Sequence, residues 1–454
     1  MRDHNVTGQQ SKPASAQDGD VLVLGAGIAG LFAASRLTEA GYKVVVIERS
    51  HRIGGTHRSE NIGPYSFDVG SIFYEANARL FQMAENLAEM CPEVWRDQRR
   101  IAPDGKILHY PVEPREILRA SSWRAMLALT DMARSRMIVR RDGTLDAISR
   151  QRLGLRFYRD TGLLSYITRF HHVSPQQIDE RFFFHRMGFI EKSTRAVELL
   201  RLGWRSLASR KRINAGQRRA LRIRPFEGYD SLFAPIRERL EQAGVRFIFN
   251  ENLQTVERTA DDFLVKTANA VYRAPSLVST IPIDALHQAL FGEPTGLVSL
   301  DMTTLFVSAG QINDRSGHVL FNFHPQGRWK RATIYSKLYP DAPTDRAFMG
   351  VEITIPPGGA HDPEEGFADF RDHLSSLGVA QDLRLEGSAF VEHAYPLYSR
   401  DADGLNEAAL ARIEATGIIM VGRQGRFEYL PTSSGVIRRV AEELDKIEPF
   451  PVQP

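Results

Sequence analysis

The chain has 454 residues, of which 43% are hydrophobic and 25% are charged, and its formal net charge is +3. This composition is that of a globular protein and excludes a disordered or fibrous chain. The length predicts two or three domains. No apolar run reaches the roughly 18 residues that a transmembrane helix needs, so none is expected.

Cysteine and histidine usage bounds the chemistry further. The single cysteine, Cys91, cannot form a disulfide within the chain and suits a reducing compartment, so we expect a cytoplasmic protein. Neither cysteine pairs nor zinc-like histidine spacing occurs, so no metal site is predicted. Residues 1–19 lack the apolar core of a signal peptide and are predicted to form a flexible tail.

Residues 20–48 follow the order strand, glycine turn, helix, strand. In the turn GAGIAG, Gly25 allows a tight bend, Gly27 lets a pyrophosphate approach the backbone, and Gly30 lets the helix pack close to the strand. Glu48 ends the second strand, where a carboxylate binds ribose hydroxyls. The pattern predicts a dinucleotide site, with Ile28 and Ala29 at the helix N-terminus that faces the pyrophosphate.

Further elements follow in chain order, and most of the segment 113–224 is predicted to be helical. Turn residues and apolar periodicity predict a hairpin at 99–111, a helix at 228–243, short strands over 253–280, a strand-rich stretch at 302–355, a helix at 366–377, a buried strand at 417–423 and a helix from about 434 to 447.

Basic residues are unevenly distributed. Between Arg201 and Arg224 there are nine Lys or Arg and no acidic residue, and a second arginine-rich stretch covers 115–141. Solvated helix faces explain both stretches, but an anionic substrate or a negatively charged membrane surface also fits them. The stretch 113–141 is a candidate interfacial helix, and hence a possible peripheral membrane contact. No known nucleic-acid-binding module occurs, so no nucleic-acid partner is expected.

Three segments carry a resemblance to a known family. Arg52-Ile53-Gly54-Gly55 follows the second strand, GPYSFDVG covers 63–70, and MVGRQGRFEY covers 420–429. With these segments the chain resembles the FAD-binding amine oxidase superfamily. The resemblance implies FAD as cofactor, rather than NAD.

The same resemblance implies the residues that contact FAD. These are Gly25, Gly27, Ile28, Ala29, Gly30, Glu48, Arg49, Gly54, Gly55, Thr56, Asp68, Gly70, Ser71, Leu253, Gly422, Arg423, Thr432, Ser433, Ser434 and Val436.

A narrower resemblance is to the protoporphyrinogen oxidase-like and UDP-galactopyranose mutase-like flavoproteins. It rests on the segments 165–186, 224–229 and 393–398. It implies Arg169, Arg186 and Tyr395 as substrate contacts, and Arg331 is a further candidate because a planar guanidinium suits an anionic substrate. Gly70-Ser71-Ile72 stands where the mutase-like group often has Gly-His, so no catalytic residue can be named.

Three functions stay open. The first is an FAD-dependent oxidoreductase that transfers a hydride between a small-molecule substrate and the flavin. The second is a flavin-dependent isomerase of a nucleotide sugar. In such an enzyme, arginines would bind the diphosphate group of the substrate. The third is a flavin-binding protein without catalysis. The sequence gives no prediction of the oligomeric state.

The predicted fold is α/β. A discontinuous Rossmann-type FAD-binding domain is expected from residues 20–80, 225–285 and 385–454. An inserted α+β substrate domain is expected from residues 81–224 and 286–384.

Overall fold

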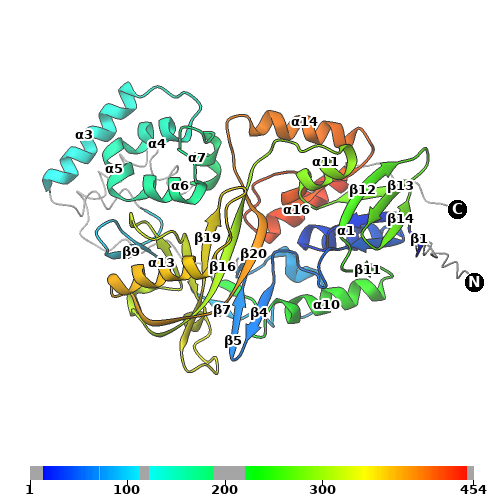
Figure 1. The fold of residues 1–454 in the computed structure, drawn as a ribbon, viewed down its shortest axis with the longest axis horizontal. Helices are drawn as coiled ribbons and strands as arrows, with labels where there is room; N and C mark the ends of the chain where they lie inside the picture. The colour runs from blue at the N-terminus through cyan, green and yellow to red at the C-terminus, as the bar shows by residue number, and fades with distance from the viewer. Residues whose placement is uncertain (1–13, 71, 113–121, 188–219, 447–454) are drawn as a thin grey trace, which may run out of the picture.

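The computed structural model describes residues 14–70, 72–112, 122–187 and 220–446 (Figure 1). The fold is α/β, as predicted. Its two largest described sheets have five and seven strands. Figure 1 shows the five-stranded sheet with its helices at one end of the molecule, the seven-stranded sheet in the middle, and a group of helices beyond it.

The five-stranded sheet is parallel and draws its strands from three distant parts of the sequence. The strands stand in the order β11 (Arg246–Ile248), β3 (Val44–Ile47), β2 (Val21–Leu24), β15 (Ser276–Ser279) and β21 (Ile419–Met420). Because β2 is central, the turn that follows it lies at the middle of the sheet's carboxyl edge, where such sheets bind ligands.

All four residues of β2 are buried, and their side chains alternate between two cores. Val21 and Val23 pack into the core shared with α1 (Ile28–Glu39), α10 (Tyr229–Gln242) and α16 (Ser433–Leu444). Leu22 and Leu24 pack into the opposite core, with α11 (Ile283–Phe291) and α14 (Ala402–Glu414). Burial on both faces explains why this strand is wholly apolar.

A four-stranded sheet joins the second of these cores. Its order is β1 (Ala14–Asp18), β14 (Ala270–Ala274), β13 (Phe263–Thr267) and β12 (Leu253–Arg258). The prediction of a flexible tail over residues 1–19 is wrong for β1, which pairs in parallel with β14. The sequence of β1 has no hydrophobic strand pattern. The strand forms because the edge of β14 offers main-chain groups that are free to pair with it.

The seven-stranded sheet forms the centre of the other half. Its order is β20 (Ala380–Pro396), β16 (Ser299–Ile312), β19 (Ala347–Ile355), β18 (Arg331–Ile334), β17 (Val319–Asn322), β8 (Gln98–Ile101) and β9 (Ile107–His109). The pairing of β8 with β9 confirms the predicted hairpin. Helix α13 (Pro363–Ser376) packs Phe370 and Leu374 on this sheet. The domain boundary predicted at residue 385 falls inside β20, so residues 385–396 belong to this sheet.

The helices α3 to α7 form a separate cluster, which we call the helical lobe. They are α3 (Ser122–Ile138), α4 (Leu145–Leu153), α5 (Leu155–Asp160), α6 (Leu163–His171) and α7 (Arg181–Arg186). Their shared core includes Ile148, Tyr158, Ile167 and Phe183. The helical character predicted for 113–224 is confirmed within the described residues, except at β10 (Leu221–Ile223), which pairs with β6 (Phe73–Glu75) and β7 (Glu93–Val94).

The remaining described elements are short. They are the hairpin β4 (Ser59–Ile62) and β5 (Tyr65–Asp68), helices α12 (Tyr335–Leu338) and α15 (Gly422–Gly425), and 3-10 turns at Arg79–Gln82 and Asp314–Ser316.

Candidate functional site

The glycine turn after β2 contains two glycines that the fold itself requires. Gly25 has φ +96°, and a Cβ there would lie 2.6 Å from the Thr280 Oγ1 atom. A Cβ on Gly30 would lie 1.8 Å from the carbonyl oxygen of Gly25. Any side chain at either position therefore forces the backbone apart, so both glycines are explained by folding alone.

Gly27 is different, because no contact among the described residues requires a glycine there. Its φ of −72° and ψ of 177° suit any residue. A Cβ would meet only the Gly55 Cα atom, at an ordinary contact distance of 3.8 Å. The space in front of Gly27 is a cradle that a Cβ would partly fill, which fits a position where a phosphate approaches the backbone.

The second glycine pair closes this cradle from the other side. The Gly54 N–H donates to the Ala26 carbonyl oxygen at 2.8 Å, and Gly27 and Gly54 form a parallel bridge. Gly55 has φ +63°, and its Cβ would come within 3.1 Å of the Gly27 Cα atom. The GAGIAG turn and the Gly54–Gly55 pair are separated in the sequence, but together they form one surface of main-chain atoms.

The start of α1 contributes the positive end of a helix dipole to this surface. Gly27 is the N-cap and has no side-chain cap bond, and the first turn holds no acidic residue. Ile28 is buried and Ala29 is half-buried. N–H groups at such a helix start are suited to an anion.

Glu48 fixes a carboxylate beside the same turn. Its side chain is buried at the end of β3 and accepts hydrogen bonds from the Ala26 N–H at 2.7 Å and the Ser50 N–H at 2.9 Å. Each carboxylate oxygen can accept more than one bond, so capacity remains for a ribose hydroxyl. Arg49 points outward and pairs with Glu392 at 3.1 Å.

The C-terminal segment reaches this surface through α15. A Cβ on Gly422, which has φ +81°, would lie 2.7 Å from the Ala29 Cβ atom, so α15 packs directly on the first turn of α1. The next residue, Arg423, donates to the Ala394 carbonyl oxygen on β20 at 3.4 Å. A small cavity at this junction is lined in part by Arg423, Gln424 and His393. The α15 segment thus joins the glycine surface to the seven-stranded sheet.

Helix α16 begins beside the same segment with a standard cap. The Thr432 hydroxyl accepts from the Gly435 N–H at 3.1 Å, and the Ser434 hydroxyl accepts from the Arg79 N–H at 3.2 Å. Ser433 is the first residue of the helix, and Val436 packs against the core under α1.

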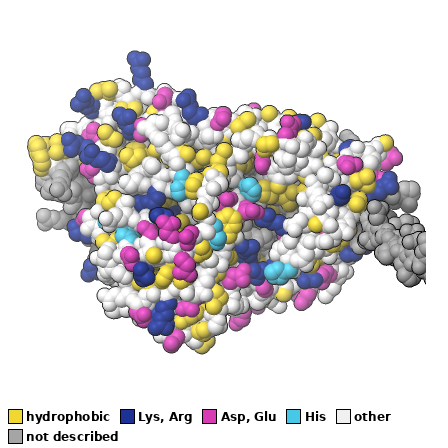
Figure 2. Space-filling view, viewed as in Figure 1, with side chains coloured by type: hydrophobic (Ala, Val, Ile, Leu, Met, Phe, Trp, Pro, Cys, Tyr) yellow, Lys and Arg dark blue, Asp and Glu magenta, His cyan; other side chains and the backbone are white. Residues whose placement is uncertain are grey.

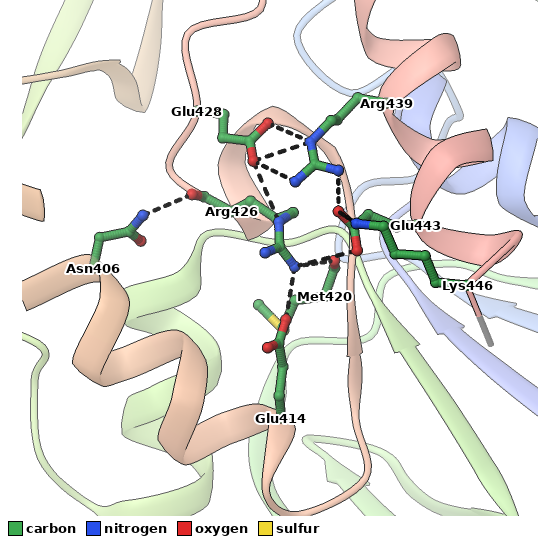
Figure 3. A network of polar contacts seen from close by, with 8 residues as sticks. All are labelled: Asn406, Glu414, Met420, Arg426, Glu428, Arg439, Glu443 and Lys446. Atoms are coloured by element: carbon green, nitrogen blue, oxygen red, sulfur yellow. Dashed lines mark hydrogen bonds and ion pairs between the residues drawn. The ribbon is translucent and has the colours of Figure 1, made fainter.

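A network of charged side chains holds the loop between α15 and α16 (Figure 3). The Arg426 guanidinium bonds to Glu414 at 2.7 Å and to the Met420 carbonyl oxygen at 3.0 Å. Arg439 on α16 bonds to both oxygens of Glu428 at 2.9 Å. Lys446 Nζ also bonds to Glu443 at 3.0 Å. These bonds tie the loop to α14 and α16, and so fix the position of Arg423.

Other predicted cofactor residues lie elsewhere or are engaged. Asp68 is fully buried and forms an ion pair with Arg224 at 2.7 Å. Leu253 lies on β12 and packs into the core on the far side of the sheet. A Cβ on Gly70 would lie 3.0 Å from the Thr56 carbonyl oxygen, so these two segments are in contact. Ser71 lies outside the described residues.

The structure adds His57, which the sequence analysis did not single out. It lies two residues after Gly55, with its ring centroid 5.5 Å from Tyr229 and 6.3 Å from Tyr74. Burial, and then the positive charge of Arg423, lowers the pKa of His57 to about 4. The imidazole is therefore uncharged at neutral pH, and it lies near Arg423. Its position two residues after the Gly-Gly pair was the available sequence signal.

Two of the predicted substrate residues meet in a buried charged cluster on the seven-stranded sheet. Arg331 and Glu352 are cross-strand partners on β18 and β19, and Arg331 Nε lies 2.8 Å from a Glu352 oxygen. The Tyr395 hydroxyl on β20 donates to Glu352 at 3.1 Å. Lys330 Nζ lies 3.4 Å from Glu352 and 3.8 Å from the centre of the Tyr395 ring. We call these four residues the Glu352 cluster.

The charges of the Glu352 cluster stabilise one another. Burial alone would raise the pKa of Glu352, but Arg331 and Lys330 outweigh it and the pKa lies below its ordinary value. Tyr395 directly follows Ala394, whose carbonyl oxygen Arg423 reaches. The Glu352 cluster and the α15 segment therefore contact adjacent residues of β20. Glu352 on β19 and Lys330, which directly precedes β18, were missed because neither belongs to a recognisable sequence motif.

The other two predicted substrate arginines do not join this cluster. Arg169 on α6 donates to the carbonyl oxygens of Asn322 and His324. Arg186 ends α7, and its side chain lies outside the described residues.

The parallel sheet, the glycine surface at its carboxyl edge and the buried Glu48 carboxylate are the features of a dinucleotide-binding fold. The family model described as flavin containing amine oxidoreductase matches residues 28–304. The chain therefore belongs to the flavin-containing amine oxidoreductase family. It is a flavoenzyme, and its cofactor is FAD.

Curated relatives share only short segments with the chain. An L-amino acid oxidase, Cdc18, from Crotalus durissus cumanensis is 33% identical over 111 residues, which are 21% of this chain and 22% of that protein. A neurosporene-forming phytoene desaturase from Rhodobacter capsulatus is 42% identical over 65 residues, which are 14% of this chain and 12% of that protein. The matched segments thus span about a fifth or less of these relatives.

Solved structures match over almost the whole chain. Reduced UDP-galactopyranose mutase superposes with a TM-score of 0.77 at 17% identity, covering 94% of this chain and 95% of the mutase. A putative protoporphyrinogen oxidase from Exiguobacterium sp. 255-15 gives a TM-score of 0.70 at 16% identity, covering 95% and 99%. At these identities the likeness establishes the fold, and the predicted resemblance to both groups is confirmed at that level.

Proposed function

We propose that the chain is an FAD-dependent oxidoreductase that transfers a hydride between a small-molecule substrate and the flavin. The observation that carries the proposal is Gly27, a glycine that no contact among the described residues requires and that a bound phosphate would explain, within a family defined by its flavin. Relatives with matched segments are named as oxidases and desaturases, which supports redox chemistry. When bound, the isoalloxazine supplies the electron-accepting group.

The proposed FAD contacts follow from the surface around Gly27. The backbone of Gly27 and Gly55 and the start of α1 receive the pyrophosphate, and Glu48 receives the ribose. Arg423 is near enough to His57 for its charge to lower the pKa of that histidine, and we assign both residues to the flavin end. Arg49, Thr56, Asp68, Gly70, Ser71 and Leu253 remain predictions as cofactor contacts, as do the residues at the start of α16.

The substrate is proposed to lie between the α15 segment and the Glu352 cluster. Tyr395 and Phe170 present aromatic rings there, with centroids 5.2 Å apart, and Lys330 Nζ lies 4.2 Å from the Phe170 ring centre. Because the single negative charge of Glu352 faces two positive charges, those of Arg331 and Lys330, this side of the proposed substrate site is weakly positive. Its role is to orient a substrate and exclude water, since its charged groups are already satisfied.

The second candidate is a flavin-dependent isomerase of a nucleotide sugar, favoured by the close superposition on the mutase. It needs arginines free to hold a diphosphate. Arg331 is engaged by Glu352, Arg224 by Asp68, and Arg169 by backbone oxygens. These internal contacts favour the oxidoreductase.

The cellular location that we propose is the cytoplasm. Cys91 is the only cysteine of the chain and is buried, so the fold contains no intrachain disulfide that an oxidising compartment would supply.

One experiment separates the two candidates. The purified holoprotein is mixed anaerobically with panels of amino acids, amines and polyenes, and the visible flavin band is followed. In parallel, dithionite-reduced protein is incubated with UDP-galactopyranose. Bleaching by a panel member supports the oxidoreductase. Sugar isomerisation by the reduced protein alone, with no bleaching in any panel, would replace it with the isomerase.

A further inference from the structure

The outer face of α3 is apolar and exposed. The described residues contain seven large hydrophobic side chains that are exposed, and five of them are on this one helix. Met137 is 81% exposed, Trp123 64%, Ile138 61%, Met126 48% and Leu129 45%. Isolated exposed hydrophobics are ordinary, but a set gathered on one helix marks an interaction surface.

The helical periodicity places three of these residues on one stripe. With about 100° of turn per residue, Trp123, Met126 and Met137 fall within about 60° of one another. Met132 falls opposite to them and is buried in the core of the helical lobe. The stripe therefore lies on the side of α3 opposite to the core that the described helices of the lobe share. Figure 1 shows α3 at the far end of this lobe.

The surface around the stripe is basic. Residues 122–160 contain nine arginines and four aspartates, a net charge of +5, whereas the whole chain carries +3 and the remainder therefore −2. Arg134, Arg140 and Arg156 are exposed among them. Figure 2 shows Lys and Arg side chains gathered over this lobe, with hydrophobic side chains at its edge.

We propose that this face of α3 docks on an anionic lipid membrane surface. The side chains of Trp123, Met126 and Met137 enter the headgroup region, and the surrounding arginines contact lipid phosphates. Trp is a residue that membrane interfaces favour. No helix among the described residues is long and apolar enough to cross a bilayer, so the contact is peripheral.

The charges favour a membrane over a second copy of the chain. Two copies meeting through this face would bring together two segments of net charge +5, which disfavours association. An anionic bilayer instead complements both properties of the surface, because it offers negative headgroups above an apolar interior.

The test is sedimentation of the full-length holoprotein with sucrose-loaded vesicles. Vesicles of phosphatidylcholine alone are compared with vesicles that also contain phosphatidylserine, at low and high salt. We expect the protein to sediment with the anionic vesicles, and salt to weaken the binding. The triple variant Trp123→Ser/Met126→Ser/Met137→Ser is expected to bind about tenfold or more weakly.

A matched control separates this effect from general loss of apolar surface. Trp95 is 58% exposed but lies outside the helical lobe, so Trp95→Ser should bind vesicles like the wild type. Circular dichroism and the visible flavin band confirm that each variant is folded and loaded. Failure of the wild type to bind anionic vesicles, or equal binding by the triple variant, would overturn the proposal. A concentration-dependent dimer that only the triple variant abolishes would assign the face to a second copy instead.

Discussion

The surface around Gly27 is made of backbone, whereas the cluster around Glu352 is made of charged and aromatic side chains. The first is held by short main-chain contacts, such as the 2.8 Å bond from Gly54 to Ala26. The second is held by the ion pairs of Glu352 with Arg331 and Lys330 and by a hydrogen bond from Tyr395 on β20. The first region is therefore tested by adding one carbon to a glycine, and the second by removing one charge from a side chain.

The largest expected effect is that of Gly30→Ala. Its Cβ would lie 1.8 Å from the Gly25 carbonyl oxygen, so α1 cannot stay packed on β2. We expect loss of the cooperative unfolding transition or insoluble protein. The control is Gly404→Ala on α14, where a Cβ meets no atom within 4 Å. An unchanged melting temperature for Gly30→Ala would show that the turn is not rigid.

Next in size is Glu352→Gln. Removal of this carboxylate leaves Arg331 and Lys330 buried without their counter-charge, which costs about 3–5 kcal/mol of unfolding free energy. The matched control is Glu365→Gln, which breaks an ion pair with Arg328 whose side chains are 56% and 62% exposed. Such exposed pairs contribute roughly 0–1 kcal/mol. Urea denaturation measures both variants, and equal losses would contradict a buried, charge-balanced cluster.

A smaller effect is expected for Glu48→Gln. The amide keeps the side-chain shape but removes the charge that receives ribose hydroxyls, which weakens FAD binding by about 1–3 kcal/mol. Because Glu48 also accepts bonds from Ala26 and Ser50, unfolding of the FAD-free protein is measured alongside calorimetric titration. An unchanged affinity for FAD would remove Glu48 from the site.

The smallest predicted effect concerns His373, which lies under the seven-stranded sheet. The Trp329 indole N–H donates to His373 Nδ1 at 3.0 Å. Burial, and then the charges of His324 and Arg169, lowers the pKa of His373 from 6.5 to about 4. Between these two values the unfolded chain binds a proton that the folded chain does not.

Stability that depends on His373 is therefore complete above about pH 6.5 and falls as the pH drops toward about 4. When the pH falls from 7 to 5, the free energy of unfolding of the wild type should decrease by roughly 1–2 kcal/mol more than that of His373→Gln. The exposed His51→Gln serves as control in urea denaturation at both values. Parallel losses in wild type and His373→Gln would contradict the assignment.

The two regions also differ in how far the sequence predicts them. Gly25, Gly27, Gly30 and Glu48 lie within 24 residues of one another, and local turn and strand chemistry determines where they lie. The Glu352 cluster depends instead on the register of β18, β19 and β20, which a single sequence does not contain. Tyr395 was found only through resemblance and Arg331 only as an arginine suited to an anionic substrate, and their partner Glu352 was not found.

Residues 14–18 and His57 teach the same lesson on a smaller scale. β1 exists because β14 offers it an unpaired edge, not because of its own sequence pattern. His57 is recognisable only once the fold brings it to Tyr229 and toward Arg423. In each case a distant segment supplies the physical cause.

The central claim is that the open space at Gly27 is occupied by FAD. Its most direct test is calorimetric titration of FAD into FAD-free wild type, Gly27→Ala and Gly404→Ala. The added carbon at Gly27 meets only the Gly55 Cα atom, at 3.8 Å, so the variant should fold normally. We predict that Gly27→Ala keeps the wild-type circular dichroism and unfolding transition but binds FAD about 100-fold or more weakly, while Gly404→Ala binds like the wild type. A folded Gly27→Ala protein with wild-type affinity for FAD would contradict the account.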